Sequence, residues 1–518
     1  MFLGLGSGVE PGEKMQNKER MKRKDGMAGD SFSRRTAGIS KGWSAFRSKG
    51  WGFLFLTFFS LFASGCGGSG GGGSSATGGS SEILYALSTS GGGGSNGSIT
   101  EIALNTSSGS LYNGSYALSS QTIAVGSNPL QFEFDPNGQP YLFVLNNGSG
   151  NTLSFEGGIL TATGSANGSV QVFSVGSQGL SINPVDTQLT GKSPVSMAID
   201  NAGVYLAVAD QGNGSNSGDV ELFQIGPGGS LGPGSKYSSP CSYPNKVLFA
   251  PGSDGLASET LYILCSSPEI TPLILPAVYY CFISNLSICG SENTIGSNTA
   301  LFGMTVDPSG TYMVAPGISG GAGILPEFSI NSSNKSLMPY ANPGQINSTS
   351  FIPAGQPAII VSGTSEKILV GNYDVSSSSS FASGSSTNYA ACPISNTSSL
   401  SCSLPHLSVS GPIAMITNSA GTALYIPLTG TPVVAGGNYS TGGVIQACPI
   451  SGGTVSGSCT GASTGAWPLS VTFDSYSHAF VPNYGSGNVS VYSVGTGGAL
   501  TPISTLNVGS YPVSVLVR

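Results

Sequence analysis

A seven-residue pattern of alternating apolar and polar positions recurs along the chain. A typical copy begins with Pro, carries apolar residues one, three and five places later, and ends in Asp or a small polar residue. Strict two-residue alternation predicts a strand with one buried face, and the first position is where a strand tolerates Pro. The clearest copies are 129–135, 194–200, 412–418, 468–474 and 512–518, and weaker copies begin at Pro244, Leu301 and Pro357.

Each copy is followed by the same succession of predicted elements. Asp307-Pro308-Ser309-Gly310 has Asp, Pro and Gly where a type I turn favours them. A second apolar strand such as 204–208 follows, then a loop rich in Gly, Ser and Asn, a third strand such as 169–175, and a short fourth strand. Copies start 44 to 65 residues apart. Four antiparallel strands per repeat predict an all-β chain folded as a β-propeller.

The two ends of the repeat region complement each other. The copy at 512–518 has no strands after it, whereas 83–87 and 98–104 resemble a second and a third strand without a first. We therefore expect the N- and C-terminal strands to pair and close the ring, which leaves no open sheet edge. The count is eight four-stranded blades, with seven as the alternative.

Composition and charge narrow the class of protein. With 79 Gly, 31 Pro and 39% hydrophobic residues in 518, the chain is neither disordered nor helical. After residue 66, six Lys or Arg stand against 19 Asp or Glu, a formal charge of −13, which excludes a basic nucleic-acid surface. Only two histidines occur, His406 and His478, which excludes a multi-histidine metal site.

The first 65 residues are typical of an export signal. Lys and Arg are frequent in 14–49, and the apolar run 51–62 has signal-peptide length and is too short to span a bilayer. Translation starting at Met21 or Met27 would shorten the basic region.

Ala63-Ser64-Gly65-Cys66 resembles the bacterial lipobox, with an ordinary secretion signal as the alternative. We expect Cys66 to be lipidated and 66–81 to form a Gly/Ser-rich tether, followed by the propeller at 82–518. The prediction is an exported cell-envelope lipoprotein, at the outer membrane or the cell surface, held to the membrane by its lipid anchor.

Eight further cysteines indicate an oxidising compartment. A cysteine on a third strand can bridge to a fourth strand of the same hairpin if the two Cβ atoms lie about 4 Å apart. Metal binding is disfavoured because the close pairs lack C-x-x-C spacing and a nearby His. The predicted disulfides are Cys241 with Cys265, Cys281 with Cys289, Cys392 with Cys402, and Cys448 with Cys459.

The unit at 473–500, with Phe473-Asp474-Ser475 and Val489-Ser490-Val491-Tyr492-Ser493-Val494, resembles the bacterial lactonase-like, or YVTN-type, propeller family. The similarity covers most of 82–518 and is one of repeat units, so it implies a fold more than an activity. Members of that family commonly have seven blades, and the insert at 266–277 is where our count of eight is most open to change.

Candidate ligand contacts lie where second strands end. Asp210 and Asp219 bracket a segment with alternating oxygen ligands, but its spacing is not that of an EF-hand and it holds two carboxylates. We therefore predict no metal and no cofactor. Asn372, Asp374 and Asn483 end second strands on the same face, as ligand contacts or as hydrogen-bonded turns.

No catalytic residues are recognised, which favours a non-enzymatic role. The leading hypothesis is a monomeric binding or adhesion scaffold at the cell envelope, with a carbohydrate or protein ligand. The alternative is a lactonase-like hydrolase of an uncharged substrate, because six scattered basic residues are a poor match for a phosphate dianion. A purely structural envelope component is a third reading.

Overall fold

The structure, a computed structural model, divides into residues 1–52 and 53–518, and every described residue lies in the second unit. The predicted signal peptide and Cys66 lie outside the described residues, and no helix among the described residues is long and apolar enough to cross a membrane. The described residues are 81–90, 95–105, 117–156, 159–164, 166–177, 179–212, 218–238, 243–251, 260–265, 276–285, 289–292, 299–307, 309–319, 322–339, 344–346, 358–362, 365–371, 389–393, 402, 414–428 and 442–518.

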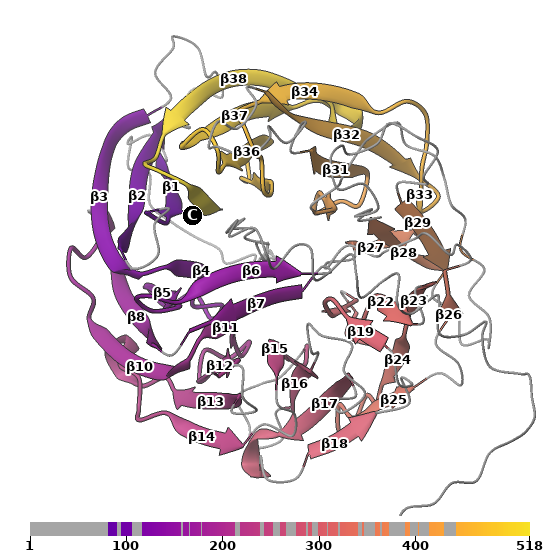
Figure 1. Cartoon of the computed structure of the whole chain (residues 1–518). Coiled ribbons are helices and arrows are strands. Elements are labelled where there is room, and N and C mark those ends of the chain that lie inside the picture. Colours follow the sequence, from indigo (N-terminus) through magenta and orange to yellow (C-terminus); the bar gives the residue numbers. More distant parts are fainter. Residues whose placement is uncertain are drawn as a thin grey trace, which may run out of the picture. The chain divides into compact units, whose positions relative to one another are not determined.

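Eight antiparallel sheets of the second unit follow one another as the blades of a β-propeller, as predicted (Figure 1). In each blade the strand from the repeated copy lies innermost, and the following strands lie progressively outward. Blade 1 is β4 (Pro129–Phe134), β5 (Tyr141–Asn146), β8 (Asn167–Gly176) and β10 (Asp186–Lys192); blade 2 is β11 (Pro194–Ile199), β12 (Tyr205–Asp210), β13 (Asp219–Gln224) and β14 (Ser235–Ser238); blade 3 is β15 (Pro244–Phe249), β16 (Thr260–Cys265), β17 (Ala277–Phe282) and β18 (Cys289–Glu292); blade 4 is β20 (Thr305–Val306), β21 (Tyr312–Val314), β24 (Glu327–Ile330) and β25 (Leu337–Pro339).

The remaining blades repeat this order from the innermost strand outward. Blade 5 is β27 (Ala358–Ser362), β28 (Ser365–Gly371) and β29 (Tyr389–Pro393); blade 6 is β30 (Ile416–Thr417), β31 (Ala423–Leu428), β32 (Gly443–Ser451) and β34 (Thr460–Thr464); blade 7 is β35 (Thr472–Phe473), β36 (His478–Asn483), β37 (Asn488–Val494) and β38 (Leu500–Asn507); blade 8 is β39 (Pro512–Val517), β1 (Ser81–Ser88), β2 (Asn96–Asn105) and β3 (Ala117–Ser127).

Blade 8 closes the ring with strands from both ends of the repeat region, which confirms the predicted pairing. β39 pairs antiparallel with β1, with Leu84 opposite Val517 and Leu87 opposite Ser514. Backbone hydrogen bonds in both directions between Ile83 and Arg518 extend the pairing to the last residue. The C-terminal strand is therefore the innermost strand of a blade whose other strands come from the N-terminal side.

The polar residue that ends most copies holds the turn to the second strand. Asp200 Oδ1 accepts hydrogen bonds from the backbone N–H groups of Val204 and Tyr205 at 2.7 and 2.6 Å. Asp307 does the same for Thr311 and Tyr312. The carboxylate replaces backbone partners that the turn lacks, which is why Asp recurs there.

Two segments depart from the predicted repeat. The weak copy beginning at Leu301 is not one strand, because it is divided between β20 and an added sheet. That sheet contains a hairpin that the chain forms between the second and third strands of blade 4. Its strand order is β19 (Thr299–Leu301), β22 (Gly317–Ser319), β23 (Ala322–Leu325) and β26 (Gly344–Gln345).

In blade 1 the corresponding loop forms the hairpin of β6 (Thr152–Glu156) and β7 (Ile159–Thr163), and β7 contacts β11 and β15. Two short strands, β9 (Gly179–Leu180) and β33 (Thr454–Val455), pair with β8 and β32.

Three disulfides join the pairs that the spacing predicts. They are Cys281–Cys289, Cys392–Cys402 and Cys448–Cys459, each with a Cα–Cα distance of 4.2 Å. Cys265 is also disulfide-bonded, while its predicted partner Cys241 lies outside the described residues. Disulfides of this number are typical of exported proteins.

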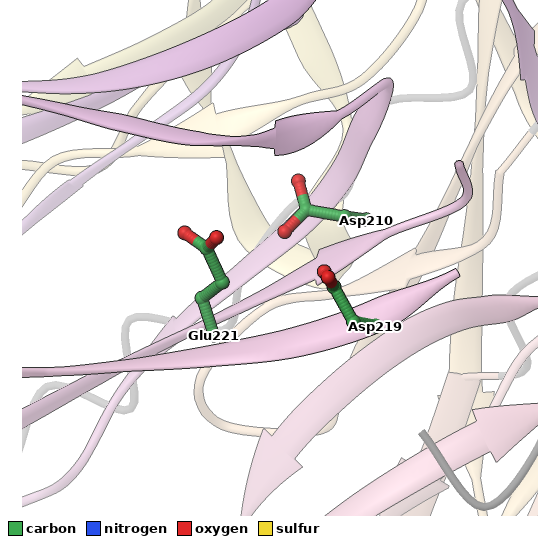
Figure 2. A group of neighbouring side chains, drawn as sticks. All are labelled: Asp210, Asp219 and Glu221. Atoms are coloured by element: carbon green, nitrogen blue, oxygen red, sulfur yellow. The ribbon is translucent and has the colours of Figure 1, made fainter. Parts of the chain in front are cut away.

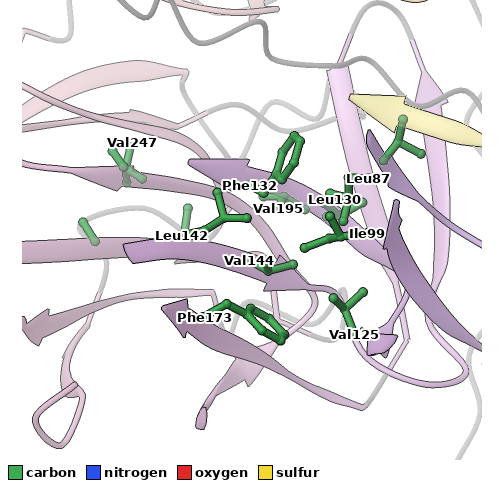
Figure 3. Packing of buried hydrophobic residues seen from close by; sticks show 14 of the residues in the cluster. Leu87, Ile99, Val125, Leu130, Phe132, Leu142, Val144, Phe173, Val195 and Val247 are labelled. Atoms are coloured by element: carbon green, nitrogen blue, oxygen red, sulfur yellow. The ribbon is translucent and has the colours of Figure 1, made fainter. Parts of the chain in front are cut away.

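Apolar side chains from neighbouring blades fill the contacts between sheets. Leu142, Val144 and Phe173 of blade 1 are fully buried and belong to one cluster with Val195 of blade 2 and Ile99 of blade 8 (Figure 3). Burial of side chains of this size contributes about 1.5–3 kcal/mol each. The core is thus a ring of contacts between blades, to which every repeat supplies one face of its strands.

Candidate metal centre and innermost strands

Asp210 and Asp219, two of the predicted ligand contacts, lie directly opposite each other in blade 2. Asp210 ends β12, Asp219 begins β13, and the two residues are register partners. Glu221 follows two residues later on β13, so its side chain points to the same face of the sheet as that of Asp219. One carboxylate oxygen of each residue lies within 4.8 Å of the others, and Figure 2 shows the three carboxylates converging.

These carboxylates are buried with few partners. Asp210 and Glu221 are each 1% exposed, whereas Asp219 is half-buried. Neither carboxylate oxygen of Asp210 has a hydrogen-bond partner, and Oδ1 of Asp219 and Oε2 of Glu221 also have none. The cation beside them is Lys236 of β14, whose Nζ lies 2.6 Å from Oε1 of Glu221. Three carboxylates therefore face one ammonium group.

Burial and mutual repulsion disturb the titration of this group. The pKa of Asp210 is raised well above its usual range, first by burial and then by the charges of Glu221 and Asp219. Burial also raises the pKa of Glu221, against the lowering effect of Lys236. A buried carboxylate without a partner needs a proton or a cation.

The cluster faces the outermost strand of blade 1. A Cβ placed on Gly191 of β10 would lie 2.9 Å from Cγ of Asp210 and 3.0 Å from Oδ1 of Asp219. Glycine is therefore the residue that lets β10 approach the carboxylates so closely. The centre is a contact between blades 1 and 2, and Asp210 also lies opposite Pro194 at the start of the innermost strand β11.

The same position in blade 7 carries neutral groups. Asn483 ends β36 opposite Asn488, and its Nδ2 donates to Asn488 Oδ1 and Ser490 Oγ at 2.8 Å. Its Oδ1 accepts from Thr464 Oγ1 at 2.6 Å, and Gly465 approaches its amide as Gly191 approaches Asp210. Asn483 is fully buried and makes these bonds, as the hydrogen-bonded alternative expects, and ligand contact by Asn483 stays a prediction.

Blade 1 repeats the neutral arrangement. Asn146 ends β5 opposite Ser169, and its Nδ2 donates to Ser169 Oγ and Gln171 Oε1 at 3.3 and 3.2 Å. Gly126 of blade 8 lies against this amide. Asn146, Ser169 and Gln171 therefore occupy the positions of Asp210, Asp219 and Glu221. Asn372 and Asp374, the other predicted contacts, lie outside the described residues.

Glu221 was not among the predicted ligand contacts, because it lies beyond the segment from Asp210 to Asp219. The signal was present, since Asp219 and Glu221 are two residues apart on a predicted strand and must share a face. The neutral residues at the equivalent positions of other repeats would have marked the acidic set as unusual.

The described innermost strands carry two charged side chains, Glu133 on β4 and Lys246 on β15. Glu133 is half-buried, its Oε2 is buried without a hydrogen-bond partner, and burial followed by the charge of Asp135 raises its pKa to about 8. Burial lowers the pKa of Lys246 to about 7. Perturbed carboxyl and amine groups of this kind are frequent at functional sites.

Comparison with known proteins supports the fold. No family model and no curated sequence matches the chain. The structure is similar to that of the dihydro-heme d1 dehydrogenase NirN, with 11% identity, coverage of 83% of this chain and 75% of that one, and a TM-score of 0.50. It is also similar to the periplasmic gluconolactonase of Pseudomonas aeruginosa, with 14% identity, coverage of 85% and 99%, and a TM-score of 0.47. A candidate 6-phosphogluconolactonase of Bacteroides fragilis has 14% identity, coverage of 86% and 100%, and a TM-score of 0.48. At these identities each similarity concerns the fold alone.

Proposed function

We propose that the protein is an exported lactonase-like hydrolase of an uncharged lactone, with Glu133 as its general base. The observation that carries this proposal is the Glu133 carboxyl group on an innermost strand, which has a buried oxygen without a hydrogen-bond partner and a pKa of about 8. A general base works best when its pKa lies near the operating pH. The gluconolactonase name of one similar structure suggests the substrate class.

The reaction requires one water and one proton carrier. The Glu133 carboxylate takes a proton from water, and the water oxygen attacks the lactone carbonyl carbon. The bond between that carbon and the ring oxygen then breaks, and the proton passes to the ring oxygen, leaving a hydroxy acid and regenerated carboxylate. Lys246, on the innermost strand of blade 3, is a second proton-carrying group of the described innermost strands.

An uncharged substrate fits the distribution of basic groups. Lys236 is paired with Glu221, and Arg518 lies over the ring of Phe134 with its guanidinium carbon 5.2 Å from the ring centroid. A phosphate dianion is usually held by several Arg or Lys side chains together. Such a set is not found on the described innermost strands.

The test is turnover of a neutral aldonolactone by the purified, oxidised protein and by Glu133→Gln. Loss of the base should lower kcat/KM by about 100-fold or more. Glu82→Gln, the same change on the second strand of blade 8, serves as the control and should keep wild-type turnover. Absence of lactone turnover by the wild-type protein, or full activity of Glu133→Gln, would refute the proposal.

A binding or adhesion scaffold is the second candidate. This candidate is supported by polar side chains of the innermost strands, because they form hydrogen bonds between blades and so have a structural role. Gln131 exchanges two hydrogen bonds with the backbone of Met197, Ser196 accepts one from Val247 N, and Thr472 donates one to Val515 O. An oligosaccharide array would test this function directly, with specific retention as the expected result.

Membrane anchoring through Cys66 belongs to either function. Cys66 follows a lipobox-like segment, and the disulfides are typical of an exported protein. Metabolic labelling with a palmitate analogue should label the wild-type protein and not Cys66→Ser. Equal labelling of both would exclude Cys66 as the lipidated residue.

A further inference from the structure

We propose that Asp210, Asp219 and Glu221 bind one hard divalent cation, calcium by preference, where blade 1 meets blade 2. The centre is separate from Glu133, because it lies at the ends of second and third strands, whereas Glu133 lies on an innermost strand. It is independent of the proposed hydrolysis.

The orientation of Asp210 is the first support. This residue is 1% exposed, it points into the cluster, and neither of its carboxylate oxygens has a hydrogen-bond partner (Figure 2). Buried polar groups in folded proteins are almost always bonded. A proton or a cation would neutralise this carboxylate, and the convergence of three carboxylates favours a cation.

The repeat supplies the second support, independent of the acidic residues themselves. Asn146 in blade 1 and Asn483 in blade 7 occupy the position of Asp210, and each donates hydrogen bonds to its neighbours on the third strand. Carboxylates at all three positions of blade 2 have no such donor among themselves. In blades 1 and 7 the amide hydrogens join the second strand to oxygen atoms of the third strand. In blade 2 a cation would join the carboxylate oxygens of the same two strands.

Charge and donor type select the kind of cation. Three carboxylates and Lys236 carry a formal charge of −2, which one divalent ion would neutralise. All donors are oxygens, which suits hard cations rather than zinc. Oxygen atoms that all lie within 4.8 Å of one another can share one ion, since Ca–O distances are about 2.3–2.6 Å.

A bound ion would fasten two blades together. Gly191 brings the outermost strand of blade 1 against the carboxylates, and the half-buried Asp219 offers a route for the ion from solvent. Calcium sites of extracellular modules commonly have Kd values of about 10⁻⁴ to 10⁻³ M. Such a site would be filled outside the cell and empty inside it, so the contact would tighten after export.

The test compares the wild-type protein with Asp210→Asn/Asp219→Ser/Glu221→Gln, which installs the neutral set found in blade 1. After treatment with a chelator, calcium titration by calorimetry should show one ion per wild-type chain and raise Tm by several degrees. The triple variant should show neither effect. Asp219→Asn, which changes the most exposed ligand, is a milder variant that should weaken calcium binding at least tenfold, and Glu82→Gln should bind as the wild type does.

Two results would overturn the site itself, and a third would overturn the type of ion. One is a wild-type protein that takes up no calcium, magnesium or manganese at millimolar concentration. The other is undiminished calcium binding by Asp219→Asn and by the triple variant. A preference for zinc over calcium would contradict the assignment of a hard cation.

Discussion

Blades 2 and 7 carry different side chains at the same position, the end of the second strand, where each blade contacts its neighbour. In blade 7, Asn483 fills its hydrogen bonds with Asn488, Ser490 and Thr464, and the contact is complete without any ion. In blade 2, Asp210 has the same place in the repeat but faces two other carboxylates. The repeat thus keeps the backbone geometry of this position in both blades. The side chains determine whether its polar groups satisfy one another by hydrogen bonds or require a cation.

The largest expected effect comes from moving the carboxylate into the neutral blade. Asn483→Asp replaces the donor to Asn488 and Ser490 by an acceptor in a fully buried place. An uncompensated buried charge costs about 3–5 kcal/mol. Chemical denaturation at pH 7 should show a loss of this size that calcium does not restore. A loss below about 1 kcal/mol would mean that the neutral network is dispensable.

A smaller effect is expected from Glu133, a half-buried residue whose Oε2 has no hydrogen-bond partner and whose acidic neighbour is Asp135. Its pKa is raised from 4.5 to about 8 in the folded protein, so between these values the folded state binds more protons than the unfolded state. Stability should therefore fall as pH rises from about 5 to 8, by on the order of 2 kcal/mol after allowance for partial exposure.

Urea denaturation of the wild-type protein and Glu133→Gln across this pH range measures the effect. The variant should lack this part of the pH dependence. Parallel pH profiles of the two proteins would show that Glu133 titrates normally.

The smallest effect on stability is expected from removing Lys236, whose ammonium group lies beside Glu221 in blade 2. Lys236→Met removes the ammonium group beside Glu221, but the lysine side chain is 58% exposed, so the cost without calcium should be about 1 kcal/mol or less. Calcium affinity should rise several-fold, because the site becomes more negative. Lys367→Met on β28 is the matched control, and unchanged calcium affinity in Lys236→Met would argue against an ion beside Glu221.

Much of the fold could be predicted from the sequence because strand alternation and turn residues are local. The Pro-led copies identified the innermost strands, and the matching ends predicted the pairing of β1 with β39. The backbone conformation of the residues that precede these prolines was less predictable. Asn128, Ser193, Trp467 and Tyr511 have φ between 51° and 56°, although a residue before Pro ordinarily favours an extended conformation.

The site was only half predictable, for a physical reason. Alternation, Pro and Asp act within one strand or turn, so the amino-acid sequence alone predicted most of the blades and the closure of the ring, but not the added sheet beside blade 4. The acidic centre depends on which outermost strand meets which second strand, and Gly191 and Asp210 come from different blades. Burial turned three ordinary acidic residues into a cation site, and burial is a property of packing between blades rather than of any one segment.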